Sequence, residues 1–272
     1  MTPAAVLDPP APGVVAFFKV LADETRLAIL RLLTLTDLRA GELVAALGLP
    51  QNGVSYHLKH LRALGLLREH RSQADARDIY YTLAWERLAA LYAAAGAVLH
   101  LSAGSFRVTR EDARPLRVLV LCTHNSARSQ LAEGLLRHLG GAAVAVVSAG
   151  TRPAAHVHPD VLAVLARAGI PTGPLHPKAV DPFLAQTFDA VITVCDRSRE
   201  QCPAFPGAPR PIHWSFPDPL EIDDAAARRD LLEAMYHDLR IRIPYFLGGV
   251  LPGEPAGGPR AAGARAGGPG TR

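Results

Sequence analysis

The chain has 272 residues, of which 49% are hydrophobic and 20% are charged, and its formal net charge is +4. This length suits two domains with a core each, and no apolar run approaches the ~20 residues of a membrane span. The first residues lack a signal-peptide pattern, and the charge permits contact with nucleic acid without requiring it. We therefore expect a cytoplasmic protein that does not enter a membrane.

The sequence of the first hundred residues predicts several helices, then a pair of strands and a last helix. Residues 1–12 are rich in Pro and Ala and are expected to be disordered. Apolar spacing predicts helices over 14–21, 24–33, 40–47, 51–64 and 84–101, with Asp23 or Thr25 as the cap of the second. Strands are predicted over 66–70 and 78–83, joined by a polar tip. The sequence thus predicts a mostly α-helical domain with a β-wing over residues 13–101.

The helix over 51–64 has an apolar face, which includes Val54, Leu58 and Leu61, and a polar outer face. A helix-turn-helix whose second helix presents polar groups is typical of DNA-reading domains. Residues 51–77 contain five basic side chains and two acidic ones. A solvated helix that binds nothing is the alternative, and charge alone leaves both open. The predicted DNA contacts are Gln51, Asn52, Ser55, Tyr56, Lys59, Arg62, Arg71 and Arg77, and we expect His57, His60 and His70 to face the groove or lie in the wing.

Three segments of this region, LADETRLAILRLL, VSYHLKHLRALGLL and a wing that ends in YYTL, resemble the ArsR-type winged-helix repressors. The resemblance implies a homodimer, formed through the first and last helices of the domain, on a double-stranded DNA operator. Repressors of this family that sense arsenite often carry cysteines in the third helix, and this third helix has none. Glu86 and His100 are too few for a metal site, so we expect no bound metal.

Residues 102–115 are polar, without a clear period, and are expected to be a linker. Alternating strands and helices then predict an α/β domain with a parallel sheet over 116–247. Strands are expected at 116–121, 143–147, 188–194 and 210–214, and helices after residue 128 and over 159–168 and 222–246. Leu131, Leu135, Leu136 and Leu139 are expected on the inner face of the first helix. Residues 248–272, rich in Gly, Pro and Ala, are expected to form a flexible tail.

A strand, a loop and a helix N-terminus meet between Cys122 and Ser129. Backbone N–H groups of such a loop can point at one centre, and the helix dipole favours negative charge there. Cys122 is expected to have a lowered pKa and to be a thiolate, and Arg128 offers two parallel donors to an oxyanion. A buried free cysteine at a strand end is the alternative. The predicted anion-binding residues are Thr123, His124, Asn125, Ser126, Ala127, Arg128 and Ser129.

The spacing Cys-x5-Arg-Ser resembles the phosphate loop of the protein tyrosine phosphatases. The run NSARSQ followed by AEG is similar to arsenate reductases with the low-molecular-weight phosphatase fold, and so are VCDRSREQCP and WSFPDP. The resemblance implies a catalytic set of Cys122, Arg128, Asp218, Cys195 and Cys202. In the mechanism that this resemblance implies, Cys122 attacks arsenate and Asp218 is the general acid. Cys195 and Cys202 complete a thiol relay, and thioredoxin or a similar external dithiol restores the thiols. No cofactor is implied.

The chain contains three cysteines, an odd count that favours thiol chemistry over a disulfide scaffold. Two other functions stay open at this point. A phosphatase-like hydrolase fused to a regulator would use the same cradle without Cys195 and Cys202, and a pure oxyanion-responsive repressor would only bind the anion. The operator sequence and the inducer cannot be deduced from the residues. We expect the two domains to be fused for co-expression, since residues 1–101 hold no cysteine that could bind arsenite.

Overall fold

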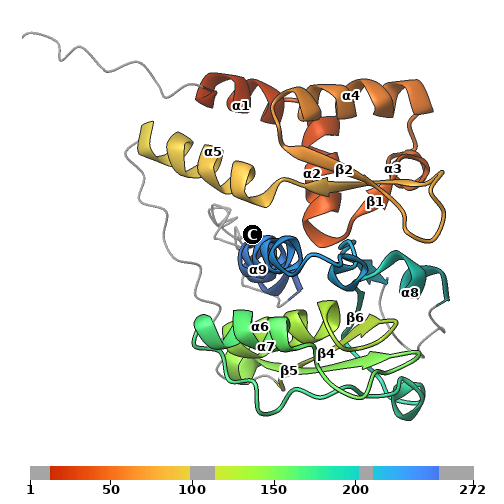
Figure 1. Cartoon of the computed structure of the whole chain (residues 1–272). Coiled ribbons are helices and arrows are strands. Elements are labelled where there is room, and N and C mark those ends of the chain that lie inside the picture. Colours follow the sequence, from red (N-terminus) through yellow and green to blue (C-terminus); the bar gives the residue numbers. More distant parts are fainter. Residues whose placement is uncertain (1–12, 99–113, 202–210, 251–272) are drawn as a thin grey trace, which may run out of the picture.

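The computed structural model describes residues 13–98, 114–201 and 211–250 (Figure 1). The ends of the expected helix 84–101, with His100, and of the expected strand 210–214 lie outside these ranges, and so do further expectations. These further expectations are the disorder of residues 1–12, the linker up to residue 113, the place of Cys202 in the relay, and the tail beyond residue 250.

The N-terminal region is a winged helix-turn-helix, as predicted. Its elements in order are α1 (Val14–Leu21), α2 (Glu24–Leu35), β1 (Leu38–Arg39), α3 (Ala40–Leu47), α4 (Gln51–Ala63), β2 (Leu67–Arg71), β3 (Ile79–Leu83) and α5 (Trp85–Val98). The strands form an antiparallel sheet in the order β1-β3-β2. Strand β1 has two residues and was not predicted, because so short a strand carries no periodic pattern.

Residues at the helix ends explain where α2 begins and where α3 ends. The Asp23 side chain caps α2 by accepting a hydrogen bond from the backbone N–H of Arg26 at 2.8 Å. Gly48 ends α3 in the left-handed region at φ 65°, where glycine has no Cβ to clash. The apolar face of α4 is buried at Val54, Leu58 and Leu61, so the predicted amphipathic helix is confirmed.

The C-terminal region is a parallel α/β sheet flanked by helices, also as predicted. Its strands are β4 (Leu116–Cys122), β5 (Val144–Gly150), β6 (Ala190–Thr193) and β7 (Ile212–His213), and its α-helices are α6 (Arg128–Gly140), α7 (Pro159–Arg167), α8 (Asp196–Gln201) and α9 (Ala225–Val250). The described part of this region also contains three single-turn 3-10 helices, η1 (Gly141–Ala143), η2 (Asp181–Phe183) and η3 (Pro219–Glu221). The sheet order is β5-β4-β6-β7, with all pairs parallel.

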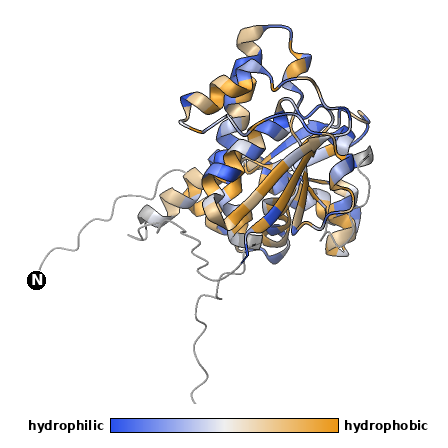
Figure 2. Ribbon diagram, turned by 90° about the horizontal axis from the view of Figure 1, so that it is seen from below, coloured by the Kyte–Doolittle hydropathy of each residue, from blue (hydrophilic) through white to orange (hydrophobic). Residues whose placement is uncertain are grey.

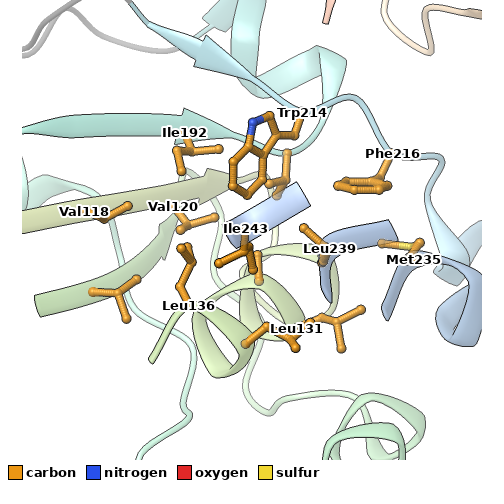
Figure 3. Packing of buried hydrophobic residues seen from close by; sticks show 14 of the residues in the cluster. Val118, Val120, Leu131, Leu136, Ile192, Trp214, Phe216, Met235, Leu239 and Ile243 are labelled. Atoms are coloured by element: carbon orange, nitrogen blue, oxygen red, sulfur yellow. The ribbon is translucent and has the colours of Figure 1, made fainter. Parts of the chain in front are cut away.

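The core of this region lies between the sheet and helices α6, α7 and α9. Figure 2 shows the central strands as mainly hydrophobic, as expected for a parallel sheet that is buried on both faces. Val120 from β4, Leu131 from α6 and Ile243 from α9 meet beneath Trp214 (Figure 3). On the opposite face Leu119, Leu121 and Val191 pack with Val180 and Phe188.

Several predicted elements differ from the structure. The segment after Cys195, for which no helix was predicted, forms helix α8. Strand β5 continues through Ser148, Ala149 and Gly150, past the expected end at residue 147. Helix α9 begins at Ala225 and continues to Val250, past the expected end at residue 246. Leu139 is 38% exposed, so the expected inner face of α6 ends at Leu136.

Helix α9 lies between the two regions (Figure 1) and joins their cores. Ile241 packs against the core of the winged helix, whereas Leu239 and Ile243 belong to the core of the sheet. Beside them the Arg242 guanidinium pairs with the Asp37 carboxylate at 2.8 Å, and both side chains are almost fully buried. The two regions are therefore packed together through a buried ion pair, a contact that no sequence pattern predicts.

Other polar groups cross the same interface. The Trp214 indole N–H donates to the Leu35 carbonyl at 3.0 Å, and the Asp37 backbone N–H donates to the His213 carbonyl at 2.7 Å. Arg199 of α8 pairs with Glu42 of α3. None of the helices within the described ranges is both long and apolar enough to cross a bilayer.

Candidate active site

The loop between β4 and α6 forms a cradle around Cys122. The Thr123, His124 and Ser126 carbonyls each accept a hydrogen bond at 2.9 Å, from the backbone N–H groups of Arg152, Ala154 and His158 respectively. Because each peptide unit is planar and trans, a carbonyl that points outward turns the following N–H inward. Consistent with this, the Asn125 N–H donates to the Cys122 Sγ at 3.1 Å.

The cradle fits tightly against the end of β5. Asn125 takes a left-handed backbone conformation, with φ 47°, which asparagine tolerates better than most residues. A Cβ added to Gly150 would lie 2.6 Å from the Thr123 carbonyl oxygen, closer than carbon and oxygen can approach without a shift of the backbone. Glycine at position 150 is thus required by the cradle.

The Cys122 thiol is 3% exposed and lies 2.9 Å from the Ser129 hydroxyl oxygen. Burial raises its pKa above the ordinary value of 9.0, and the neighbouring Cys195 adds to this effect. Hydrogen bonds from Ser129 and the Asn125 N–H, together with the charge of Arg128, lower the pKa without outweighing burial. The predicted lowered pKa is therefore wrong. The sequence argument considered the helix dipole and the positive charge of Arg128, but the sequence does not show how deeply the Cys122 thiol is buried.

Arg128 begins α6, and its side chain is only 5% exposed. Its Nη2 pairs with the Asp218 carboxylate, and its Nη1 donates to the Phe216 carbonyl oxygen at 3.2 Å. The Asp218 carboxylate also accepts from the Leu220 N–H at 3.1 Å, as the cap of η3. The structure therefore brings Cys122, Arg128 and Asp218 together at the carboxyl ends of the strands.

Cys195 is 1% exposed and lies at the same end of the sheet, two residues after β6. Its Sγ is 3.6 Å from the Thr123 hydroxyl oxygen, and the Ser198 N–H donates to it at 3.3 Å. Cys122 and Cys195 are both free thiols. Cys202 lies outside the described residues.

Comparisons with known proteins agree with this geometry. Residues 117–242 match the model of the low molecular weight phosphotyrosine protein phosphatase family, and residues 21–70 match a helix-turn-helix domain. The arsenate reductase of Halalkalibacterium halodurans is 36% identical over 107 residues, which cover 39% of this chain and 76% of that protein. The chain belongs to the arsenate reductase family.

Solved structures give weaker likenesses to parts of the chain. A thioredoxin-dependent arsenate reductase from Corynebacterium glutamicum is 33% identical, with a TM-score of 0.38, over 48% of this chain and 61% of that one. The chain thus spans less than two thirds of that protein. HlyU from Vibrio cholerae is 35% identical, with a TM-score of 0.26, over 30% of this chain and 86% of that one.

A buried network behind the cradle, which the sequence analysis missed, sets the orientation of the Ser129 hydroxyl. The Asn125 amide donates to the hydroxyl oxygens of Ser129, at 2.8 Å, and Ser148, at 2.7 Å. Its carbonyl accepts from the backbone N–H of Lys178, at 2.7 Å, and from the Gln130 amide. Since Ser129 accepts from Asn125, its own proton is free to point at the Cys122 sulfur. The run NSARSQ includes Gln130, whereas no motif points to Ser148 or Lys178.

Glu133 anchors this network from α6. Its side chain is 2% exposed, and its carboxylate accepts from the Ser148 N–H at 2.9 Å and from the Ser148 hydroxyl. Lys178 and Arg137 offset its charge, with the Lys178 Nζ at 3.4 Å. In the sequence, Glu133 is marked only by its place in the AEG run that resembles the family.

The predicted DNA-contacting side chains are all exposed, on α4 and the wing. The structure gives some of them intramolecular partners. Arg62 pairs with Glu69 at 3.0 Å, Arg77 pairs with Asp75, and Arg71 donates to the Ala76 carbonyl at 2.9 Å. Helix α4 begins at Gln51, and its exposed side includes Gln51, Asn52, Ser55, Tyr56 and Lys59.

Of the three histidines, His57 does not face the groove, while His70 lies in wing strand β2, as expected. His57 points back to Asp23 at the start of α2, with 3.5 Å between its Nδ1 and the carboxylate. His70 faces the C-terminal region, where its Nε2 bonds the Ser215 hydroxyl and its ring stacks on Tyr80. Within the described ranges, no group of three or more His, Cys, Asp and Glu side chains could hold a metal ion.

Proposed function

We propose that this chain is an arsenate reductase and a DNA-binding regulator in one polypeptide. The observation that carries the first half is the convergence of Cys122, Arg128, Asp218 and Cys195 on one oxyanion cradle. The arsenate reductase name of the 36% identical relative supports the choice of arsenate. The boundaries that we propose for the two units are residues 13–101 and 116–247.

In the first step arsenate binds to the inward N–H groups of the cradle and to the Arg128 guanidinium. There it replaces the Asp218 carboxylate as the partner of Arg128. The Cys122 thiol gives its proton to the Asp218 carboxylate and its sulfur attacks arsenic, so that a sulfur–arsenic bond forms and an arsenic–oxygen bond breaks. Asp218 then passes that proton to the departing hydroxyl group, which leaves as water. Ser129 donates a hydrogen bond to the Cys122 sulfur and so favours its deprotonated form.

In the second step the Cys195 sulfur attacks the Cys122 sulfur. The sulfur–arsenic bond breaks, its electron pair stays on arsenic, and arsenite leaves while a Cys122–Cys195 disulfide forms. The Cys195 proton passes to an oxygen of the leaving arsenite, arsenic gains two electrons and the two sulfurs lose two, so the step balances. Cys202 then attacks Cys195 and releases Cys122, and an external dithiol of the thioredoxin class reduces the Cys195–Cys202 disulfide.

The third thiol implies that α8 changes its conformation. Cys195 precedes α8 directly and Cys202 follows its last residue, Gln201. A helix rises 1.5 Å per residue, so these seven steps would span roughly 10 Å if all were helical. A disulfide requires Cα atoms within about 7 Å. We therefore propose that α8 unwinds when Cys195 and Cys202 pair.

The competing activity is hydrolysis of phosphate esters, which the same cradle could perform without Cys195. The test is to give the purified full chain arsenate with a dithiol reductant, and p-nitrophenyl phosphate in parallel. We expect arsenite release that is lost in Cys122→Ser and in Cys195→Ser. Phosphatase turnover that survives Cys195→Ser, without any arsenite release by the parental chain, would show a hydrolase instead.

For the second half we propose that a homodimer binds an inverted repeat in double-stranded DNA. Val15 and Phe18 on α1 and Tyr92 on α5 are exposed apolar side chains, at 51%, 43% and 56%, and α1 contacts α5. They supply an apolar surface for a second copy of the chain. The matched helix-turn-helix model supports DNA as the partner.

Lys59 provides the test of DNA binding, because it is an exposed cation on the outer face of α4. Each phosphate contact contributes about −0.9 to the slope of log K against log salt. Lys59→Ala should therefore weaken binding to the DNA upstream of its own gene and flatten that slope by about one phosphate contact. Arg229→Ala, an exposed arginine on α9, is the control. Equal affinity for a scrambled duplex would contradict operator recognition.

A further inference from the structure

One residue of the wing reaches the oxyanion cradle. Gln73 lies between β2 and β3, and its side-chain carbonyl accepts a hydrogen bond from the Arg128 Nη1 at 3.4 Å. Its amide donates to the Glu221 carboxylate at 3.2 Å, and its backbone N–H donates to the Asp196 carboxylate at 2.9 Å. A single wing residue thus touches the oxyanion-binding arginine, the residue after Cys195, and η3 beside Asp218.

The wing tip is held in this place by its own contacts. Ser72 is 4% exposed, its N–H donates to the Asp78 carbonyl at 2.9 Å, and its hydroxyl accepts from the Ala74 N–H at 3.0 Å. At the base of the wing, His70 bonds the Ser215 hydroxyl. Gln73 is therefore positioned before any substrate arrives, with little conformational freedom left to lose on binding.

The partners of Arg128 show what Gln73 contributes. The Nη2 meets the Asp218 carboxylate, which an incoming oxyanion must replace, whereas the Nη1 meets two neutral acceptors, the Phe216 carbonyl and Gln73. Neutral acceptors fix the plane of the guanidinium without neutralising its charge. A carboxylate in place of Gln73 would compete with the oxyanion for the same group.

We infer that Gln73 is a positioning residue of the oxyanion site, so that the winged-helix region completes the active site of the C-terminal region. For arsenate this rests on the proposed function. Binding of inorganic phosphate, which has the same tetrahedral geometry, tests it independently. The wing tip is thereby assigned a role in the site of the other region as well as its expected place beside DNA.

The experiment uses the full chain and two substitutions, Gln73→Met and Gln73→Glu. Methionine keeps the length and the backbone N–H that holds Asp196, but it loses the acceptor on Arg128. We expect Gln73→Met to weaken phosphate binding by roughly three- to tenfold, the range for one typical intramolecular hydrogen bond. The KM for arsenate should rise by a similar factor with kcat little changed. Gln73→Glu should bind phosphate more weakly still, because it adds a like charge.

Gln186→Met is the matched control. The Gln186 carbonyl accepts from the Arg117 Nη2 at 3.1 Å, so the same substitution removes a glutamine–arginine hydrogen bond outside the cradle. We expect its phosphate binding to equal that of the parental chain. A merely structural role for Gln73 predicts instead a lower Tm, a loss shared by KM and kcat, and no extra penalty for glutamate.

Parental phosphate affinity in both Gln73 variants would overturn the inference. A parental chain that binds phosphate and releases no arsenite would contradict the proposed reductase, while the Gln73 comparison on phosphate would still decide the inference.

Discussion

At the scale of single residues, the cradle depends on Asn125. Its left-handed backbone turns its N–H toward Cys122, and its amide orients the Ser129 hydroxyl. The run NSARSQ was enough to name Asn125, Arg128 and Ser129 from the sequence. The partners that orient Asn125 could not be named, because Ser148 and Lys178 are common residue types that only folding brings beside the loop.

Arg128 provides the first prediction. Lysine keeps the positive charge but has no planar fork to hold two oxygens of a tetrahedral anion. We expect Arg128→Lys to lose on the order of 10²-fold in arsenate turnover, the cost of removing one preorganised oxyanion donor. Steady-state kinetics of arsenite release measure it. Near-parental turnover would show that the loop N–H groups alone hold the substrate.

The second prediction concerns the ionisation of Cys122. Burial raises the pKa of its thiol above 9.0, so at neutral pH the resting side chain is protonated and reacts slowly as a nucleophile. The rate of alkylation of Cys122 by iodoacetamide should therefore stay low at pH 7 and rise with pH through 9 and above. Peptide mass spectrometry reads the modified residue. A rate that is already maximal at pH 7 would mean that Ser129 and Arg128 outweigh burial.

At the scale of elements, helix α8 links chemistry and packing. The hexapeptide DRSREQ has no apolar period, which is why the sequence does not predict this helix. Asp196, at its start, is buried and accepts hydrogen bonds from Gln73 and Ser215 and from His213, whose Nε2 lies at 3.0 Å. These tertiary contacts, which a single sequence does not reveal, surround the first residue of the helix.

The third prediction follows from the ionisation of Asp196. Burial raises its pKa, but the hydrogen bonds from His213, Ser215 and the Gln73 N–H outweigh burial and lower the pKa to about 2, from 3.8. The folded state thus binds the proton less tightly than the unfolded state. The stabilisation is present above pH 4 and is lost as the pH falls from about 4 to 2.

Asp196→Asn should therefore remove a pH-dependent stabilisation on the order of 2 kcal/mol. In urea unfolding between pH 5 and 2, the variant should lose stability less steeply than the parental chain does. Asp223→Asn, at an exposed carboxyl, is the control and should follow the parental curve. Identical slopes for Asp196→Asn and the parental chain would contradict the assignment.

At the scale of the whole molecule, the sequence predicts both folds and their order, because each has its own periodic pattern and its own motif. It does not predict how they pack. Arg242 is one of several charged residues in helix α9, yet its side chain is 2% exposed between Trp85 and Trp214. Nothing in the spacing of α9 shows that this arginine meets Asp37, more than two hundred residues earlier.

The fourth prediction tests this interface. Asp37→Ala leaves the Arg242 charge buried without a partner, which costs about 3–5 kcal/mol of unfolding free energy. The double variant Asp37→Ala with Arg242→Met should recover most of that loss, because a buried apolar pair replaces a buried charge. Urea denaturation of the full chain measures both.

The control is Asp75→Ala, which breaks an exposed ion pair with Arg77 in the wing and should leave the midpoint unchanged. A loss in Asp37→Ala no larger than in this control would mean that the two regions do not pack through this pair.

The central claim is that the electrons for arsenic come from Cys122 and Cys195, with Cys202 resetting the site. A rapid-quench count of arsenite per enzyme, made with thioredoxin present, tests it most directly. We predict repeated turnover in the parental chain and one arsenite per enzyme in Cys202→Ser, which stops at the Cys122–Cys195 disulfide. Turnover of Cys202→Ser at the parental rate would contradict the three-thiol relay, and arsenite release from Cys195→Ser would contradict the source of the electrons.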